Sequence, residues 1–109
     1  MPNPKSIKEP ILLYLKELKP SLQKEGISEI GLFGSFAKDE ATIYSDIDVF
    51  IRTTKAFWDK YEGGCGAACF LDDFRVKIAK HFKKEVDLCD LSGLKEDRMA
   101  DFLEGAIYV

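Results

Sequence analysis

The stretch that decides the fold is residues 44–51, Tyr-Ser-Asp-Ile-Asp-Val-Phe-Ile, in which acidic and apolar residues alternate. Because the side chains of a β-strand point alternately to its two faces, Asp46, Asp48 and Phe50 are expected on one face. The two isoleucines and the valine between them fall on the other face and are candidates for the core. The stretch therefore predicts a strand with a core face and a carboxylate face.

On the carboxylate face, Asp46 and Asp48 would lie about 6 to 7 Å apart at their Cα atoms, since a strand rises about 3.3 Å per residue. Two like charges on neighbouring positions of one face repel each other, which costs stability unless a cation lies between them. Carboxylate oxygens are hard ligands of the kind that suits Mg²⁺ or Mn²⁺. The pair therefore predicts a divalent-cation site.

A Gly-Ser pair, Gly34 and Ser35, precedes Asp46 by ten residues. Residues 27–33 before it form a short apolar stretch typical of a strand, and residues 36–38 after it can begin a short helix. Free backbone N–H groups at such a turn, together with the serine hydroxyl, favour binding of an anion. Glycine lets a phosphate approach the backbone closely, and Lys38 adds a positive charge. An anion site beside a cation site suits a nucleoside triphosphate.

This pattern resembles that of the minimal nucleotidyltransferases of the DNA polymerase beta superfamily. Their signature is an apolar residue, Gly-Ser, a gap of about ten residues, and Asp-x-Asp on a strand, which residues 32–35 and 46–48 match. The resemblance implies a third carboxylate on a later strand, and Asp87 within residues 85–89 supplies it. The ending, residues 103–109, also resembles the C-terminal helix of the family's small stand-alone members.

The resemblance implies roles for two sets of residues. The triphosphate of ATP would be held by Gly34, Ser35 and Lys38. Two Mg²⁺ or Mn²⁺ ions would be bound by Asp46, Asp48 and Asp87, with Asp87 at the attacking oxygen. One departure from the family pattern is that relatives usually have Arg-Gly where this chain has Lys38-Asp39, and lysine lacks the planar fork with which arginine binds phosphate.

The resemblance also predicts a partner. Relatives that modify transfer RNA ends or antibiotics carry extra domains for the acceptor, and no such domain is expected here. The small stand-alone members resemble antitoxins encoded beside HEPN-domain ribonuclease toxins, which implies transfer of AMP from ATP to a tyrosine of the toxin within a stable complex. Two alternatives stay open: a binding module that neutralises its partner by contact without catalysis, and a nucleotidyltransferase that modifies a small hydroxyl compound.

Length and composition limit the other classes. A chain of 109 residues with 46% hydrophobic composition predicts one domain spanning residues 1–109. A net charge of −3 argues against an extended nucleic-acid surface, which needs clustered lysine and arginine. The sequence shows no signal peptide and no membrane span, so a cytoplasmic protein is expected. Three cysteines, an odd number, favour free thiols over disulfides.

The remaining pattern predicts the other elements. Apolar residues at helical spacing predict helices over residues 6–19, 68–83 and from 94 to about 107, and alternation predicts a strand over 85–91. Pro20 is expected to end or kink the first helix, with residues 21–25 as a further turn or two before Gly26 stops it. Residues 53–67 read as a loop that contains a short segment of uncertain type. The order predicts an α+β fold, close to α/β, with a mixed sheet, helices packed on its apolar face and an open carboxylate face.

Overall fold

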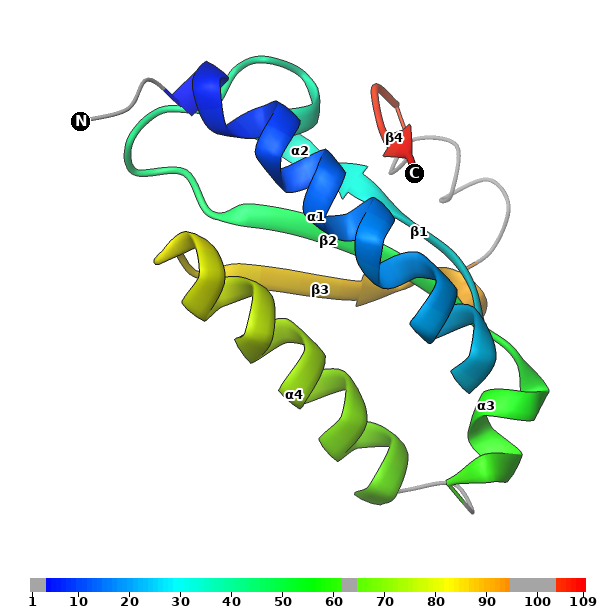
Figure 1. The fold of residues 1–109 in the computed structure, drawn as a ribbon. Coiled ribbons are helices and arrows are strands. Elements are labelled where there is room, and N and C mark those ends of the chain that lie inside the picture. The colour runs from blue at the N-terminus through cyan, green and yellow to red at the C-terminus, as the bar shows by residue number, and fades with distance from the viewer. Residues whose placement is uncertain (1–3, 62–64, 95–103) are drawn as a thin grey trace.

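A computed structural model of the chain describes residues 4–61, 65–94 and 104–109. Its strands form one mixed sheet in the order β3-β2-β1-β4 (Figure 1). The strands are β1 (Ile27–Phe33), β2 (Ile47–Thr53), β3 (Val86–Asp90) and β4 (Ile107–Tyr108). β1 pairs antiparallel with both β2 and β4, whereas β3 pairs parallel with β2. The predicted α+β class with a mixed sheet is confirmed.

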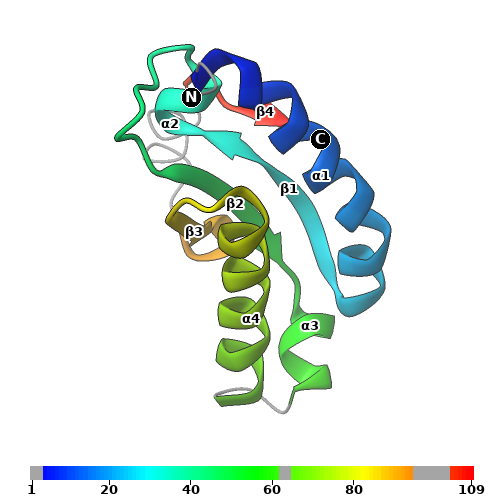
Figure 2. The same cartoon turned by 60° about the vertical axis from the view of Figure 1, so that its left-hand side comes forward.

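Two long helices, α1 (Pro4–Glu25) and α4 (Cys65–Phe82), lie along the sheet, as Figures 1 and 2 show. Shorter helical turns connect the strands: α2 (Gly34–Ala37), α3 (Lys55–Lys60) and the 3₁₀ turn η1 (Leu91–Gly93). β2 and β3 are parallel neighbours, and parallel strands cannot be joined by a tight turn. α4 is part of the crossover that connects them. Among the described residues, no helix is both long and apolar enough to span a bilayer.

The core lies between the two long helices and one face of the sheet. The alternating apolar residues of β2 are fully buried there, at 0% exposure: Ile47, Val49 and Ile51. They belong to one cluster with Ile11 and Leu15 of α1 and Phe74 and Ile78 of α4. The core face predicted from the alternation in residues 44–51 is therefore confirmed, and burial of this face fixes which way Asp48 points.

The opposite face of the sheet is covered in part, contrary to the open face expected from the sequence. Phe50 points to that face, yet its side chain is fully buried. Its ring contacts those of Tyr108 and Phe33, at centroid distances of 4.9 Å and 6.4 Å, and it lies against Gly31, its partner in β1. A small aromatic cluster thus closes one end of this face and leaves the Asp48 end to solvent and ligand.

The first helix does not end at Pro20, and the further turns expected before Gly26 are confirmed. α1 continues through Pro20 to Glu25, because Leu15 and Leu22 on either side of the proline are both buried against the sheet. Burial of two leucines contributes about 3 to 6 kcal/mol, as much as or more than the roughly 3 kcal/mol that an internal proline costs. Residues 53–67, expected as a loop, contain α3, whose Phe57 is fully buried in the core.

The expected C-terminal helix is wrong at its end. Most of it, residues 95–103, lies outside the described residues. Ile107, placed in that helix by spacing, instead begins β4, which pairs with Leu32 and Gly31 of β1. The isoleucine and the tyrosine that follows it are β-branched and aromatic residues, which favour strands, and two residues are too few to show an alternation in the sequence.

Gly31 provides a test of this arrangement. A Cβ at this position would run into the Phe50 ring and the Ile107 carbonyl oxygen. We expect Gly31→Ala to lower the free energy of unfolding by about 1 to 3 kcal/mol, the usual cost of overpacking. Urea denaturation measures this. Gly93→Ala is the matched control, because its added Cβ would meet nothing within 4 Å. Equal stabilities of the two variants would contradict the close approach.

Candidate active site

The sheet brings two of the predicted carboxylates side by side. Asp48 on β2 and Asp87 on β3 are partners in the parallel ladder, although 39 positions separate them in the sequence. Neighbouring strands lie about 4.8 Å apart, so residues in register present their side chains together on one face. Asp46 stands one residue before β2, exposed, in the segment that leads into the strand. All three carboxylates therefore lie around the beginning of β2.

The surroundings of Asp48 disfavour its ionised form. Burial, the nearby carboxylate of Asp87, a hydrogen bond with Asp87 and the charge of Asp46, in this order of size, together raise the pKa of its carboxyl to about 6. Each of these effects disfavours the ionised form, because a partly desolvated negative charge is placed beside two others. A cation bound among the three would reverse the effect and favour ionisation. The position is thus disposed to bind positive charge.

The Gly-Ser turn packs directly on this carboxylate. Phe33, the last residue of β1, is the ladder partner of Asp48, and Gly34 follows it with φ of +72°, in the left-handed region that favours glycine. A Cβ on Gly34 would collide with Oδ2 of Asp48. Any other residue would fill the space in which the turn and the carboxylate meet. The structure therefore places the predicted anion site and cation site next to each other.

α2 fixes Ser35 beside this contact. The helix is a single turn, held down by the buried side chains of Phe36 and Ala37. The backbone N–H of Glu40 donates to the Ser35 carbonyl at 2.8 Å and that of Lys38 to the Gly34 carbonyl at 3.1 Å. The backbone of the turn is thereby set before any ligand binds. Ser35 itself is partly buried, two positions beyond the ladder partner of Asp48.

Lys38 ends α2 and is exposed, and its methylene stem lies alongside Gly105 near the C-terminus. The residue after it, Asp39, has φ of +59°. This is the left-handed region that favours glycine, and aspartate is among the residues that tolerate this conformation best. The structure does not bring Lys38 into contact with the three carboxylates. Its predicted role at the triphosphate is not tested by this geometry.

The segment between α2 and β2 is held by a turn over residues 42–45, which sequence reasoning missed. The backbone N–H of Thr42 donates to the Ser45 hydroxyl at 2.8 Å, and the Ser45 N–H donates to the Thr42 carbonyl at 3.0 Å. Lys84, just before β3, donates to the Ile43 carbonyl at 3.2 Å. This turn leads directly into Asp46. Threonine and serine three residues apart are the only signal of it in the sequence.

The donor chemistry of the site fits a hard divalent cation. Carboxylate oxygens are the groups that Mg²⁺ and Mn²⁺ prefer, and the glycine contact leaves room around Asp48 that a Cβ would fill. Within residues 4–61, 65–94 and 104–109, no three potential ligands already converge closely enough to form a metal cluster. Asp46, Asp48 and Asp87 are thus neighbours in position rather than a preformed cage, and their side chains would converge on the cation as it binds.

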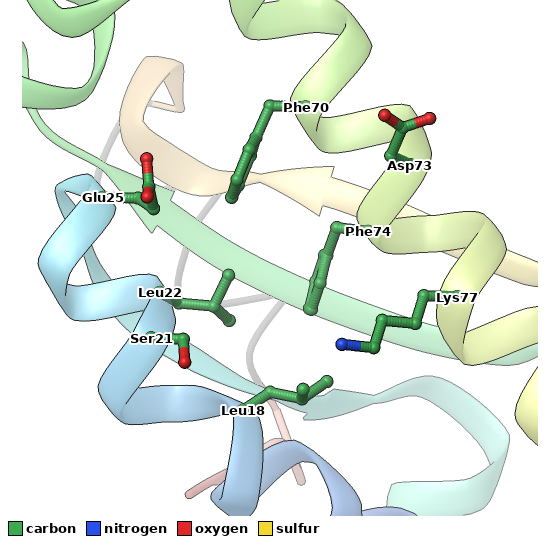
Figure 3. Close-up of a pocket in the computed structure, with 8 residues that line it drawn as sticks. All are labelled: Leu18, Ser21, Leu22, Glu25, Phe70, Asp73, Phe74 and Lys77. Atoms are coloured by element: carbon green, nitrogen blue, oxygen red, sulfur yellow. The ribbon is translucent and has the colours of Figure 1, made fainter.

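A hollow of about 360 Å³ lies elsewhere, on the helix side of the sheet. Figure 3 shows Phe70 and Phe74 of α4 facing Leu18 and Leu22 of α1 across it. None of its lining residues belongs to the predicted site. Its lining combines four apolar side chains with four polar or charged ones, which are Ser21, Glu25, Asp73 and Lys77. The candidate active site is therefore the carboxylate group at β2 and β3, not this hollow.

Comparison with known families agrees with the geometry. Residues 15–104 match the model of the nucleotidyltransferase domain, so the chain belongs to the nucleotidyltransferase domain family. The matched span contains the Gly-Ser turn and all three carboxylates. A comparison with curated proteins found no match. The general activity that follows from the family is nucleotidyl transfer.

The raised pKa of Asp48 gives a prediction about stability and pH. The folded state keeps the Asp48 proton up to about pH 6, whereas the unfolded state loses it near 3.8, so stability falls as pH rises through this window. Asp48→Asn removes the penalty at pH 8. We expect a melting temperature higher by about 4 to 8 °C at pH 8, corresponding to ~1 kcal/mol after solvent screening, and little change at pH 4.

Thermal melts followed by circular dichroism in metal-free buffer measure this difference. Asp73→Asn, on the exposed face of α4, is the matched control and should show no such dependence on pH. An Asp48→Asn melting temperature that stays equal to that of the wild type at pH 8 would contradict the proposed crowding of charge.

Proposed function

We propose that the chain transfers AMP from ATP to a hydroxyl group, with Mg²⁺ or Mn²⁺ as cofactor, and that the acceptor is a tyrosine of a partner HEPN-domain ribonuclease toxin. The observation that carries the proposal is the register of Asp48 with Asp87 beside the Gly34 turn. The family match supports nucleotidyl transfer as the reaction class. The chain would act as an antitoxin, as a single domain, and its exposed free thiols, Cys65 and Cys69, favour the reducing cytoplasm.

The reaction requires one bond to form and one to break. The acceptor hydroxyl oxygen bonds to the α-phosphorus of ATP, the bond from this phosphorus to the oxygen bridging to the β-phosphate breaks, and pyrophosphate leaves. Bound divalent cations supply charge neutralisation on the phosphoryl oxygens and alignment of the attacking and leaving oxygens. Asp46 and Asp48 would hold both ions. Asp87 would hold the ion at the attacking oxygen and would accept the proton of the attacking hydroxyl.

The Gly34-Ser35 turn holds the departing side of the substrate. Its backbone N–H groups and the Ser35 hydroxyl donate hydrogen bonds to phosphate oxygens, and Gly34 permits the close approach. Because the turn already packs on Asp48, binding of the triphosphate there places its α-phosphate beside the carboxylates. With both substrates held in this way, the transfer from ATP to the acceptor hydroxyl becomes a reaction within one complex instead of a collision between two free molecules.

A protein acceptor is favoured by the surface beside the site. Tyr44, two residues before Asp46, is 87% exposed, and Ile43 is 48% exposed. Adjacent exposed apolar side chains on a fixed turn next to the carboxylates suit contact with a partner surface better than contact with a small polar compound. The turn therefore supports a macromolecular acceptor in a stable complex.

Asp87 separates the enzyme from a module that acts by contact alone. Asp87→Asn changes the charge but little of the volume. We expect it to abolish labelling of the co-purifying partner by α-³²P-labelled ATP while binding of the partner, measured by calorimetry, stays within about twofold. Control of the partner's ribonuclease activity should be lost as well.

A variant that silences the partner fully without labelling it would favour neutralisation by contact. Normal labelling by Asp87→Asn would show that Asp87 has no part in the reaction. Glu85→Gln is the matched control, because Glu85 is also exposed and lies two positions away, before the strand begins.

Ser35 and Lys38 test the anion site. Ser35→Ala should weaken transfer by one to two orders of magnitude, since a hydrogen bond to a charged phosphate contributes about 1.5 to 3 kcal/mol. Lys38→Ala should cost less, because its exposed side chain makes a looser contact with the phosphates. Single-turnover labelling kinetics compare the two. A larger loss for Lys38→Ala would contradict the placement of the triphosphate on the Gly34-Ser35 turn.

A further inference from the structure

Asp39 places a negative charge where the proposed function needs the opposite. It follows α2 directly, four residues after Ser35, and its side chain is 55% exposed. A triphosphate is itself strongly negative, so an uncompensated carboxylate within about 10 Å of it would weaken binding by direct repulsion. Its left-handed φ of +59° adds a conformational cost that glycine would avoid.

A lysine from a distant part of the chain reaches this carboxylate. The Lys8 ammonium lies 3.0 Å from Oδ1 of Asp39 and also donates to the Ala37 carbonyl at 3.3 Å. The Ala37 carbonyl is at the end of α2, where carbonyl groups lack partners within the helix. One ammonium group thus bridges the carboxylate and the backbone of the turn that follows Ser35.

The position of Lys8 is set by the core. It lies on α1 next to Ile7, which packs on the core cluster, and one turn before the fully buried Ile11. Only 18% of its own side chain is exposed, so its ammonium has fewer alternative positions than those of the exposed lysines of α1. The lysine is therefore held at Asp39 by packing as well as by charge.

We propose that Lys8 is a positioning residue of the nucleotide site, which cancels the charge of Asp39 and so sets the affinity for the triphosphate. This inference rests on the proposed function, because it takes the Gly34-Ser35 turn as the triphosphate site. Asp39 and Lys8 act together as a neutral pair. Removal of one partner leaves a net charge beside the phosphates, and removal of both restores neutrality.

The pair makes a quantitative prediction for binding. Lys8→Ala should weaken binding of Mg²⁺-ATP and of inorganic tripolyphosphate about five- to tenfold, because it leaves Asp39 uncompensated. Asp39→Asn, which keeps the size and the tolerance of the left-handed conformation, should tighten binding of both about threefold. The double variant should return to within about twofold of the wild type. AMP lacks the β- and γ-phosphates, so its affinity should change by less than about twofold in each variant.

Isothermal titration calorimetry measures these affinities, and thermal melts confirm that each variant is folded. Lys8→Arg keeps the charge and should bind like the wild type. Lys16→Ala, which removes an exposed lysine of α1 away from the turn, is the matched control and should have little effect. The loss in Lys8→Ala should shrink at 0.5 M salt, by about half or more, because exposed charges are screened. A merely structural role would not show this salt dependence.

The outcomes separate this inference from the proposed function. Wild-type protein that binds neither Mg²⁺-ATP nor tripolyphosphate would overturn both. ATP binding that is unchanged in Lys8→Ala would overturn the pair alone. A double variant as weak as Lys8→Ala would also overturn it, because Lys8 would then act on the phosphates or the backbone independently of Asp39. Equal losses for AMP and ATP would assign Lys8 a general structural role and overturn the charge argument.

Discussion

The parallel pairing of β2 with β3 forces two carboxylates, Asp48 and Asp87, into the same position of a sheet, and the candidate site depends on this constraint. Like charges in register oppose the pairing that brings them together. The ladder forms nevertheless, because the alternating residues on the other face of the strands are buried. Burial of Ile47, Val49 and their neighbours stabilises the fold by several kcal/mol, which exceeds the repulsion between a half-buried and an exposed carboxylate. Burial of the core face thus keeps the two carboxylates close together despite their mutual repulsion.

At α2, too, apolar residues fix the backbone while polar groups face the candidate site. Phe36 and Ala37 hold α2 from the core side, while Ser35 and the backbone N–H groups remain available on the other. Gly34 joins the two sides, since only a residue without Cβ leaves room for the Asp48 carboxylate. Phe50 closes the far end of the carboxylate face with its own aromatic contacts. Packing therefore fixes the backbone around the site, and only the carboxylate side chains would have to converge when a cation binds.

The sequence predicted those features that depend on local periodicity. Alternation over residues 44–51 is a strong signal because one face of β2 is apolar and buried while the other carries the carboxylates. It predicted the core face correctly. The nearness of Asp87 to Asp48 could not be derived from periodicity. Their pairing depends on the crossover through α4, so only the family resemblance indicated it. β4 was missed because two residues carry no period. The helical turns after Pro20 were expected, and burial of Leu15 and Leu22 explains why the helix does not end at the proline.

The contact of Lys8 with Asp39 could not be predicted from the sequence, because no local pattern indicates it. This contact spans 31 positions and depends on how α1 lies across α2. The departure at residues 38–39 was visible in the sequence, but only the lysine was interpreted as a weakness of the phosphate site. The counter-charge of Asp39 is supplied by another element and is seen only in the structure. Asp39 brings two costs, a left-handed backbone with φ of +59° and a negative charge near the proposed phosphate site. One ammonium group that contacts both the carboxylate and the Ala37 carbonyl offsets part of each. A substitution that looks damaging in one element can therefore be compensated by a residue in another, and only the tertiary structure relates the two.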